Sequence, residues 1–215
     1  MTDNQAGSVA LVLGGIVFLL MLISGNPLLS LGHGETQMRF ATRRRRVIRE
    51  AEEASPHEAR SALETLSAID PRASQDIEFI RTSAVVYERL VQAELMRLFP
   101  EFSVANNANN SPSLADFTIL TPDRHAIFVE LKSLRSPVSA NVIKQVMGVA
   151  AASLSGCLLV SNQRLTQSAN TLLHMAQRGG TAASFVQWRD EVDSDALKGA
   201  VLSLLREMGH GASNG

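Results

Sequence analysis

The 215-residue sequence contains one cysteine, Cys157, and none of its five histidines has a partner at metal-ligand spacing. The single thiol excludes an internal disulfide framework and fits a reducing compartment. A zinc site built from cysteine and histidine is also excluded. Because Cys157 lies within the apolar run 157–160, we expect it to be a small residue of the core.

Motifs for nucleotide-driven chemistry are absent as well. The sequence has no Gly-rich phosphate loop, no Walker-type motif and no Gly-x-Ser-x-Gly elbow, so it carries no nucleotide motor of its own. Its net charge of −1 argues against a strong overall attraction to nucleic acid, and any such contact must come from local patches. The hydrophobic content of 45% indicates a globular protein.

Charged residues are missing from positions 6–25. This run has about the length, roughly 20 residues, that one helix needs to cross a bilayer. No basic residue precedes it and no small-x-small cleavage site follows it, so a transmembrane helix within 1–25 is favoured over a cleaved signal peptide. We therefore expect a membrane anchor at the N-terminus.

A cluster of arginines follows this apolar run, with four in succession at Arg43, Arg44, Arg45 and Arg46. The positive-inside rule then places the N-terminus outside and the remainder in the cytoplasm, at the cell (inner) membrane. The cluster would attract anionic lipid, and a DNA-contacting or nuclear-import patch is the alternative. We expect a transmembrane helix at 1–25, a basic juxtamembrane linker and stalk helix at 26–70, and a globular domain at 71–215.

The predicted stalk helix begins at a capping box, Ser-Pro-His-Glu at 55–58. Apolar residues follow it at helical spacing at Ala59, Ala62, Leu63 and Leu66. This stripe predicts a helix that serves as a stalk or binds a partner. Asp70 and Pro71 interrupt the helix, and the domain boundary is placed there.

The stretch 115–132, ADFTILTPDRHAIFVELK, predicts two short strands joined by a polar turn at 121–125. In the second strand the two-residue period places Glu130 and Lys132 side by side on one face. If Leu120 pairs with Ala126 across the turn, Asp116 lies opposite Glu130, with Cβ atoms about 4.5–5.5 Å apart. A slip of one residue would send Asp116 to the other face.

Two opposed carboxylates repel each other unless a cation lies between them. Mg²⁺ is commonly held by one or two carboxylates together with water. A neighbouring lysine can position a water or stabilise a developing oxyanion. Asp116, Glu130 and Lys132 are therefore a suitable set for metal-assisted hydrolysis of a phosphodiester. The alternative interpretation is that they are ordinary surface charges, because an isolated Glu-x-Lys triplet is common on solvated strands.

The order of elements around this set resembles the PD-(D/E)xK nuclease superfamily, in particular its Mrr-type restriction endonuclease branch. The segments that carry the resemblance are VVYERLVQAELMRLF, ADFTIL, IFVELKS, SANVIKQVMGVAAAS and GCLLVSNQRLTQSANTLLHMA, between about residue 84 and the C-terminus. The resemblance implies an α/β fold, a restriction-endonuclease-like mixed sheet flanked by helices, here preceded by one transmembrane helix and a helical stalk. The sequence departs from the family pattern at Ala115, where a proline would precede the aspartate.

The resemblance also implies the metal ligands. Mg²⁺ or Mn²⁺ would be held by Asp116, Glu130 and the carbonyl group of Leu131. Glu88 matches the acid of the family's first helix and would add a carboxylate to the metal site. Glu94 is the alternative for that role.

Two further catalytic roles follow from the same resemblance. Lys132 would orient the nucleophile or stabilise the transition state. Gln145, in the predicted helix 139–153, matches a polar residue that points toward the active face in related nucleases. Lys144 is the alternative, and spacing does not separate the two.

These expectations combine into a membrane-anchored, Mg²⁺-dependent endonuclease that hydrolyses DNA and acts against incoming foreign DNA. DNA is favoured over RNA only because the resembled family cleaves it. Cleavage of two strands usually needs two active sites, which favours a homodimer. One alternative is a catalytically inactive, membrane-tethered DNA-binding or scaffold module of the same fold. Another is a membrane-anchored helix whose globular end docks a partner, an interpretation supported by an exposed stripe around Leu63.

Overall fold

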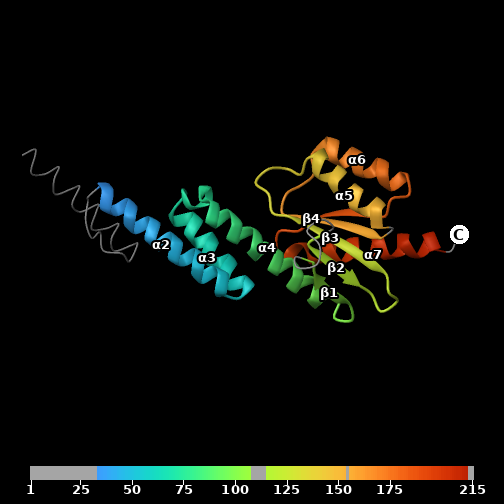
Figure 1. Cartoon of the computed structure of the whole chain (residues 1–215), viewed down its shortest axis with the longest axis horizontal. Helices are drawn as coiled ribbons and strands as arrows, with labels where there is room; N and C mark the ends of the chain where they lie inside the picture. The colour runs from blue at the N-terminus through green and yellow to red at the C-terminus, as the bar shows by residue number, and fades with distance from the viewer. Residues whose placement is uncertain (1–32, 108–114, 154, 213–215) are drawn as a thin grey trace, which may run out of the picture. The chain divides into compact units, whose positions relative to one another are not determined.

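The computed structural model describes residues 33–107, 115–153 and 155–212. The chain divides into two compact units, Met1–Arg46 and Val47–Gly215, and the second unit begins within helix α2 (His33–Glu53). All five strands of the described residues belong to the second unit, where they form a mixed sheet flanked by helices (Figure 1). The predicted mixed α/β architecture is therefore confirmed.

The strands follow the sheet in the order of the sequence. They are β1 (Ser103–Asn106), β2 (Phe117–Leu120), β3 (Ala126–Lys132), β4 (Gly156–Ser161) and β5 (Ala183–Gln187). The pairs β1–β2 and β2–β3 are antiparallel, whereas β3–β4 and β4–β5 are parallel. Every residue of β4 is buried, as expected for a strand covered on both faces.

The hairpin of β2 and β3 has the register that the sequence predicts. Leu120 pairs with Ala126, and the turn between them is closed by the Thr121 N–H, which donates to the His125 carbonyl at 3.0 Å. Arg124 in this turn has a φ of 64°, the left-handed conformation that a tight turn requires. The side chains of β3 alternate between half-buried and buried, which places Glu130 and Lys132 on the same face.

Helices cover both faces of the sheet (Figure 1). On one face, α4 (Ile77–Leu98) and α7 (Ser194–Ala212) bury Val91, Leu95 and Leu204 against sheet residues that include Ile119 and Val129. On the other face, α5 (Ala140–Ser153) and α6 (Gln167–Arg178) form a second apolar cluster. Cys157 is fully buried in this second cluster, so its predicted role as a core residue is confirmed.

Helix α3 (Pro56–Ile69) has the predicted capping box, in which Ser55 and Glu58 bond reciprocally. Its apolar stripe does not face solvent. Ala59, Leu63 and Leu66 are buried in the same core as α4 and the sheet, and Leu63 is only 4% exposed. The hypothesis of an exposed docking stripe around Leu63 is therefore wrong, because α4 covers that stripe.

The predicted membrane span at 6–25 lies outside the described residues. Within the described residues, which begin at 33, no helix is long and apolar enough to cross a membrane. The membrane anchor and the domain limits at residues 25 and 70 stay predictions. The arginine cluster 43–46 lies within α2.

Candidate active site

Four of the predicted site residues come together in space from three parts of the chain. Glu88 lies half-buried on α4, Asp116 directly precedes β2, and Glu130 and Lys132 occupy the end of β3. Burial raises the pKa of Glu88, Asp116 and Glu130 raise it further, and Lys132 opposes them. The charges of Asp116, Glu130 and Lys132 thus all act on Glu88, which places these three groups in its neighbourhood.

Lys132 and Glu130 form a direct ion pair. The Lys132 Nζ lies 2.5 Å from Glu130 Oε1, and the two side chains are 28% and 14% exposed. A pair this sheltered from water is screened less than one on the open surface. Glu130 also acts on Cys157: burial, with a smaller effect of the Glu130 charge, raises the pKa of that thiol to about 12.

The backbone fixes the Asp116 carboxylate against β3. The Leu131 N–H donates to Asp116 Oδ2 at 2.6 Å, and the Asp116 N–H donates to the Val129 carbonyl at 3.1 Å. On the other side, the Asn107 N–H donates to the Asp116 carbonyl at 3.0 Å. Asp116 is therefore held between β1 and β3, beside the backbone of Leu131.

Two residues at the end of β4, which sequence reasoning did not include in the site, hold the segment that follows Lys132. The Ser161 hydroxyl donates to the Lys132 carbonyl at 2.7 Å. The side chain of Asn162 accepts from the Leu134 N–H at 2.8 Å and donates to the Leu134 carbonyl at 2.9 Å. The signal in the sequence is a polar pair directly after a buried parallel strand, where functional groups commonly gather.

Gln145 is exposed on α5, and so is the alternative Lys144. No hydrogen bond or ion pair among the described residues joins either one to the carboxylates. Glu94, the alternative to Glu88, is buried and accepts two bonds from the Arg97 guanidinium at 2.6 and 2.8 Å and one from the Ser194 hydroxyl. Glu94 thus anchors the start of α7, whereas Glu88 lies in the carboxylate cluster.

The donor set of this cluster suits a hard divalent cation, because Glu88, Asp116 and Glu130 offer only carboxylate oxygen. Asp116 Oδ1 and Glu130 Oε2 take no part in the bonds described above. Over the described ranges, no group of three or more histidine, cysteine or acidic side chains is already arranged as a metal cage. The chemistry of the donors fits Mg²⁺ or Mn²⁺, with the remaining positions left to water or substrate.

Comparisons with known proteins do not assign a function to this site. No protein-family model matches the chain, and no curated protein does. A solved structure of SfsA from Pyrococcus furiosus in complex with Ca²⁺ is similar at 17% identity, over 60% of this chain and 53% of that one, with a TM-score of 0.27. The chain thus spans about half the length of that structure. A likeness at this level carries no argument about fold or activity.

Proposed function

We propose that this protein is a Mg²⁺- or Mn²⁺-dependent endonuclease of the restriction-endonuclease-like fold that hydrolyses phosphodiester bonds in DNA. The observation that supports the proposal is the carboxylate cluster of Glu88, Asp116 and Glu130 with Lys132 beside it. Burial and the charges of Asp116 and Glu130 raise the pKa of Glu88, and carboxylates gathered in this way repel one another unless they bind a cation. The resemblance to Mrr-type nucleases supplies the substrate class.

Each residue of the cluster has a defined task in this mechanism. Asp116 and Glu130, with the Leu131 carbonyl and Glu88, would hold the ion. The bound ion would supply Lewis acidity and a water of lowered pKa. Lys132, held by Glu130 at 2.5 Å, would place its ammonium group where it can orient the nucleophile or stabilise charge on the phosphate. Gln145 would assist from α5 only if substrate binding brings it to the cluster.

The location of the activity rests on the N-terminal segment. A membrane span within 1–25 and the arginine cluster 43–46 would hold the nuclease at the cytoplasmic side of the inner membrane, against anionic lipid. This placement suits action on foreign DNA as it enters the cell. A homodimer would supply the two active sites that cleavage of both strands needs.

A second candidate is an inactive DNA tether of the same fold. The contact that favours it is the direct Glu130–Lys132 ion pair, because Lys132 already neutralises part of the cluster without a metal. The absence of proline before Asp116, where Ala115 stands, points the same way. Such a protein would bind DNA without cutting it.

Plasmid cleavage by the full chain in detergent micelles separates the two candidates. A fragment beginning at Pro71 is unsuitable, because it would remove Leu63 and Leu66 from the core. We expect nicking with Mg²⁺ or Mn²⁺ that stops in EDTA and in the Asp116→Asn and Lys132→Ala variants. Lys198→Ala, an exposed lysine of α7, should cut normally. DNA binding without cleavage at any metal concentration would favour the tether and contradict the nuclease.

A further inference from the structure

The charges of this protein are divided unevenly along the sequence. Residues 131–189, from the end of β3 to just after β5, contain no aspartate or glutamate, so all 21 acidic residues lie elsewhere. The same segment contains six basic residues, which are Lys132, Arg135, Lys144, Arg164, Arg178 and Arg189. The net charge of −1 therefore conceals a positive segment that includes both helices of the second apolar cluster, α5 and α6.

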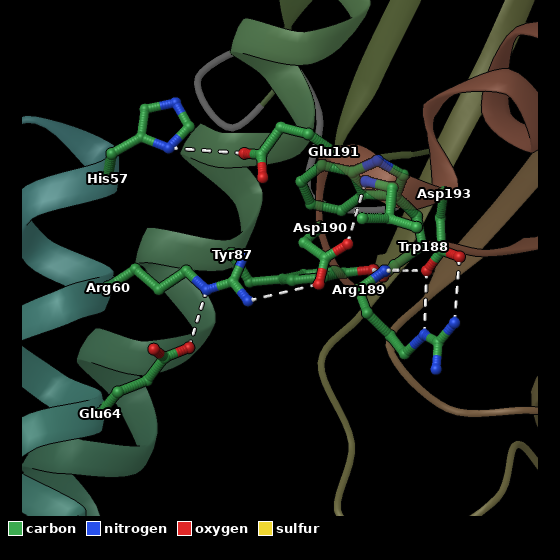
Figure 2. A network of polar contacts seen from close by, with 10 residues as sticks. His57, Arg60, Glu64, Tyr87, Trp188, Arg189, Asp190, Glu191 and Asp193 are labelled. Carbon is green, nitrogen blue, oxygen red and sulfur yellow. Dashed lines mark hydrogen bonds and ion pairs between the residues drawn. The ribbon is translucent and has the colours of Figure 1, made fainter.

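Two of the six basic residues are already neutralised by acids of the chain itself. Lys132 is held in the ion pair described above. The Arg189 guanidinium donates to the Asp193 carboxylate at 2.9 and 3.0 Å. Figure 2 shows this pair together with Arg60 of α3, whose guanidinium lies 2.8 Å from the Glu64 carboxylate. Arginines in this network are thus unavailable to an anionic ligand.

The other four basic residues, Arg135, Lys144, Arg164 and Arg178, are exposed. No hydrogen bond or ion pair in the described part of the chain uses their side chains. Arginine and lysine keep their positive charge at neutral pH, and both bind phosphate oxygen well. These four side chains can therefore bind an anion from outside the chain.

Arg135 and Arg164 lie on neighbouring loops, which follow the parallel strands β3 and β4. Hydrogen bonds hold the two loops side by side. The Asn162 side chain binds both backbone groups of Leu134, and the Val138 N–H donates to the Arg164 carbonyl at 2.9 Å. The two arginines are therefore carried by one joined pair of loops, at the edge of the sheet where ligands preferentially bind in α/β proteins.

This edge adjoins the candidate active site. Arg135 follows Lys132 by three residues. Glu130 and Lys132 share their face of β3 with Phe128, which packs against the cluster under α5 and α6. Lys144 lies in the second turn of α5, on the helix layer that covers this face. The unpaired cations thus lie on the same side of the sheet as the ion pair of the active site.

We propose that Arg135, Arg164 and Lys144 form a phosphate-binding surface, the basic edge, that holds the DNA backbone beside the carboxylate cluster. The inference rests on the proposed function, whose site it extends. Contacts to phosphate position a nucleic acid without reading its sequence. The residues of the basic edge are therefore substrate-binding residues and take no part in bond cleavage. Anionic lipid is the competing partner, but a lipid surface seated here would cover the cluster.

The test measures binding of fluorescein-labelled duplex DNA by fluorescence anisotropy, using the full chain in detergent micelles with EDTA. Two duplexes of unrelated sequence are titrated over a series of salt concentrations, and cleavage is measured separately with Mn²⁺. The variants are Arg135→Ala, Arg164→Ala and the charge-retaining Arg164→Lys. Because neither arginine side chain is bonded within the described part of the chain, each variant should fold, and thermal unfolding checks this.

Arg178→Ala is the matched control. Arg178 is an exposed arginine of the same acid-free segment and the last residue of α6. It lies about 16 Å along the helix from Gln167, where α6 begins after the second loop. The control removes the same charge away from the basic edge, so it separates a local contact from an effect of net charge.

We expect Arg135→Ala and Arg164→Ala each to weaken DNA binding by about fivefold to tenfold at about 0.1 M salt. Each should also lower the slope of log affinity against log salt concentration by about one. The losses should be the same for both sequences, because phosphate contacts are independent of sequence. Arg164→Lys should keep the slope of the wild type, and Arg178→Ala should bind as the wild type does.

Four results would overturn the inference. Wild-type binding by both alanine variants would do so, and so would an equal loss in Arg178→Ala; metal-dependent cleavage that persists would then leave the nuclease intact. Displacement of the DNA by phosphatidylglycerol added to the micelles would assign the basic edge to lipid. No binding of DNA, with no cleavage, would overturn both proposals. Binding that the two alanine variants weaken, without any cleavage, would instead support the basic edge and refute the nuclease.

Discussion

Replacing Lys132 with alanine removes the cation that contacts Glu130 and should destabilise the protein in the absence of metal. The Nζ–Oε1 distance is 2.5 Å, and the glutamate side chain is only 14% exposed. A hydrogen bond to a charged group contributes about 1.5–3 kcal/mol to stability. Because the lysine side chain is 28% exposed, solvent screens part of the attraction, and we expect a loss of about 2 kcal/mol.

The loss has a second source in the neighbouring carboxylates. Lys132 lowers the pKa of Glu88, so its removal leaves Glu88, Asp116 and Glu130 to repel one another without a nearby opposing charge. A divalent cation should compensate by binding the folded state. We therefore expect Mn²⁺ to restore much of the stability that Lys132→Ala loses.

Urea unfolding in EDTA and in Mn²⁺, followed by the fluorescence of Trp188, measures both effects. Trp188 is the sole tryptophan and is fully buried, so its emission reports on unfolding of the second unit. In thermal unfolding the same loss corresponds to a Tm lower by about 4–8 °C. Lys198→Ala should stay within about 0.5 kcal/mol of wild type. A Lys132→Ala variant as stable as Lys198→Ala would refute the ion pair and the electrostatic cluster built on it.

Three further predictions concern other groups of the site. Burial, followed by the charges of Asp116 and Glu130, raises the pKa of Glu88, so the contribution of Glu88 to stability should be lost as pH rises from the unfolded-state pKa of about 4.3 through the higher folded-state value. Glu88→Gln should therefore stabilise the protein more at pH 8 than at pH 4 in urea unfolding, and an equal effect at both pH values would contradict this cause. Burial raises the pKa of the Cys157 thiol to about 12, so this residue should resist iodoacetamide at pH 8 until urea unfolds the chain. Mass spectrometry follows the labelling, and rapid labelling of the native protein would show that the thiol is accessible. Asn162→Ala removes two hydrogen bonds to Leu134 and should cost about 2 kcal/mol in urea unfolding, whereas a loss below about 0.5 kcal/mol would mean that the segment after Lys132 is held in other ways.

Local pattern was sufficient to predict the hairpin that carries the site. The polar turn and the alternation on either side of it fix the pairing of Leu120 with Ala126, because a one-residue slip would bury the charged face. The continuous apolar run of β4 likewise predicts a strand covered on both faces. In both cases, neighbours in the sequence supply the whole signal.

Contacts between distant segments could not be predicted in this way. Glu88 and Glu94 lie on the same helix, and only the rotation of α4 against the sheet decides that Glu88 enters the carboxylate cluster while Glu94 binds Ser194. The stripe of α3 has the same apolar pattern whether it is covered or exposed, and the packing of α4 decides the outcome. A cleft of about 400 Å³, lined by α3, by α4 and by residues that follow β3, β4 and β5, depends on five separate segments, and no single stretch of sequence carries a signal for it.

Calorimetric titration with Mn²⁺ tests most directly whether the carboxylate cluster is a metal site. The full chain in detergent micelles is compared with Asp116→Asn and with Glu207→Gln, an exposed acid of α7 that serves as the matched control. We predict one saturable site in the wild type, weakened more than about tenfold in Asp116→Asn and unchanged in Glu207→Gln. Absence of Mn²⁺ binding, or binding that Asp116→Asn leaves intact, would contradict the account.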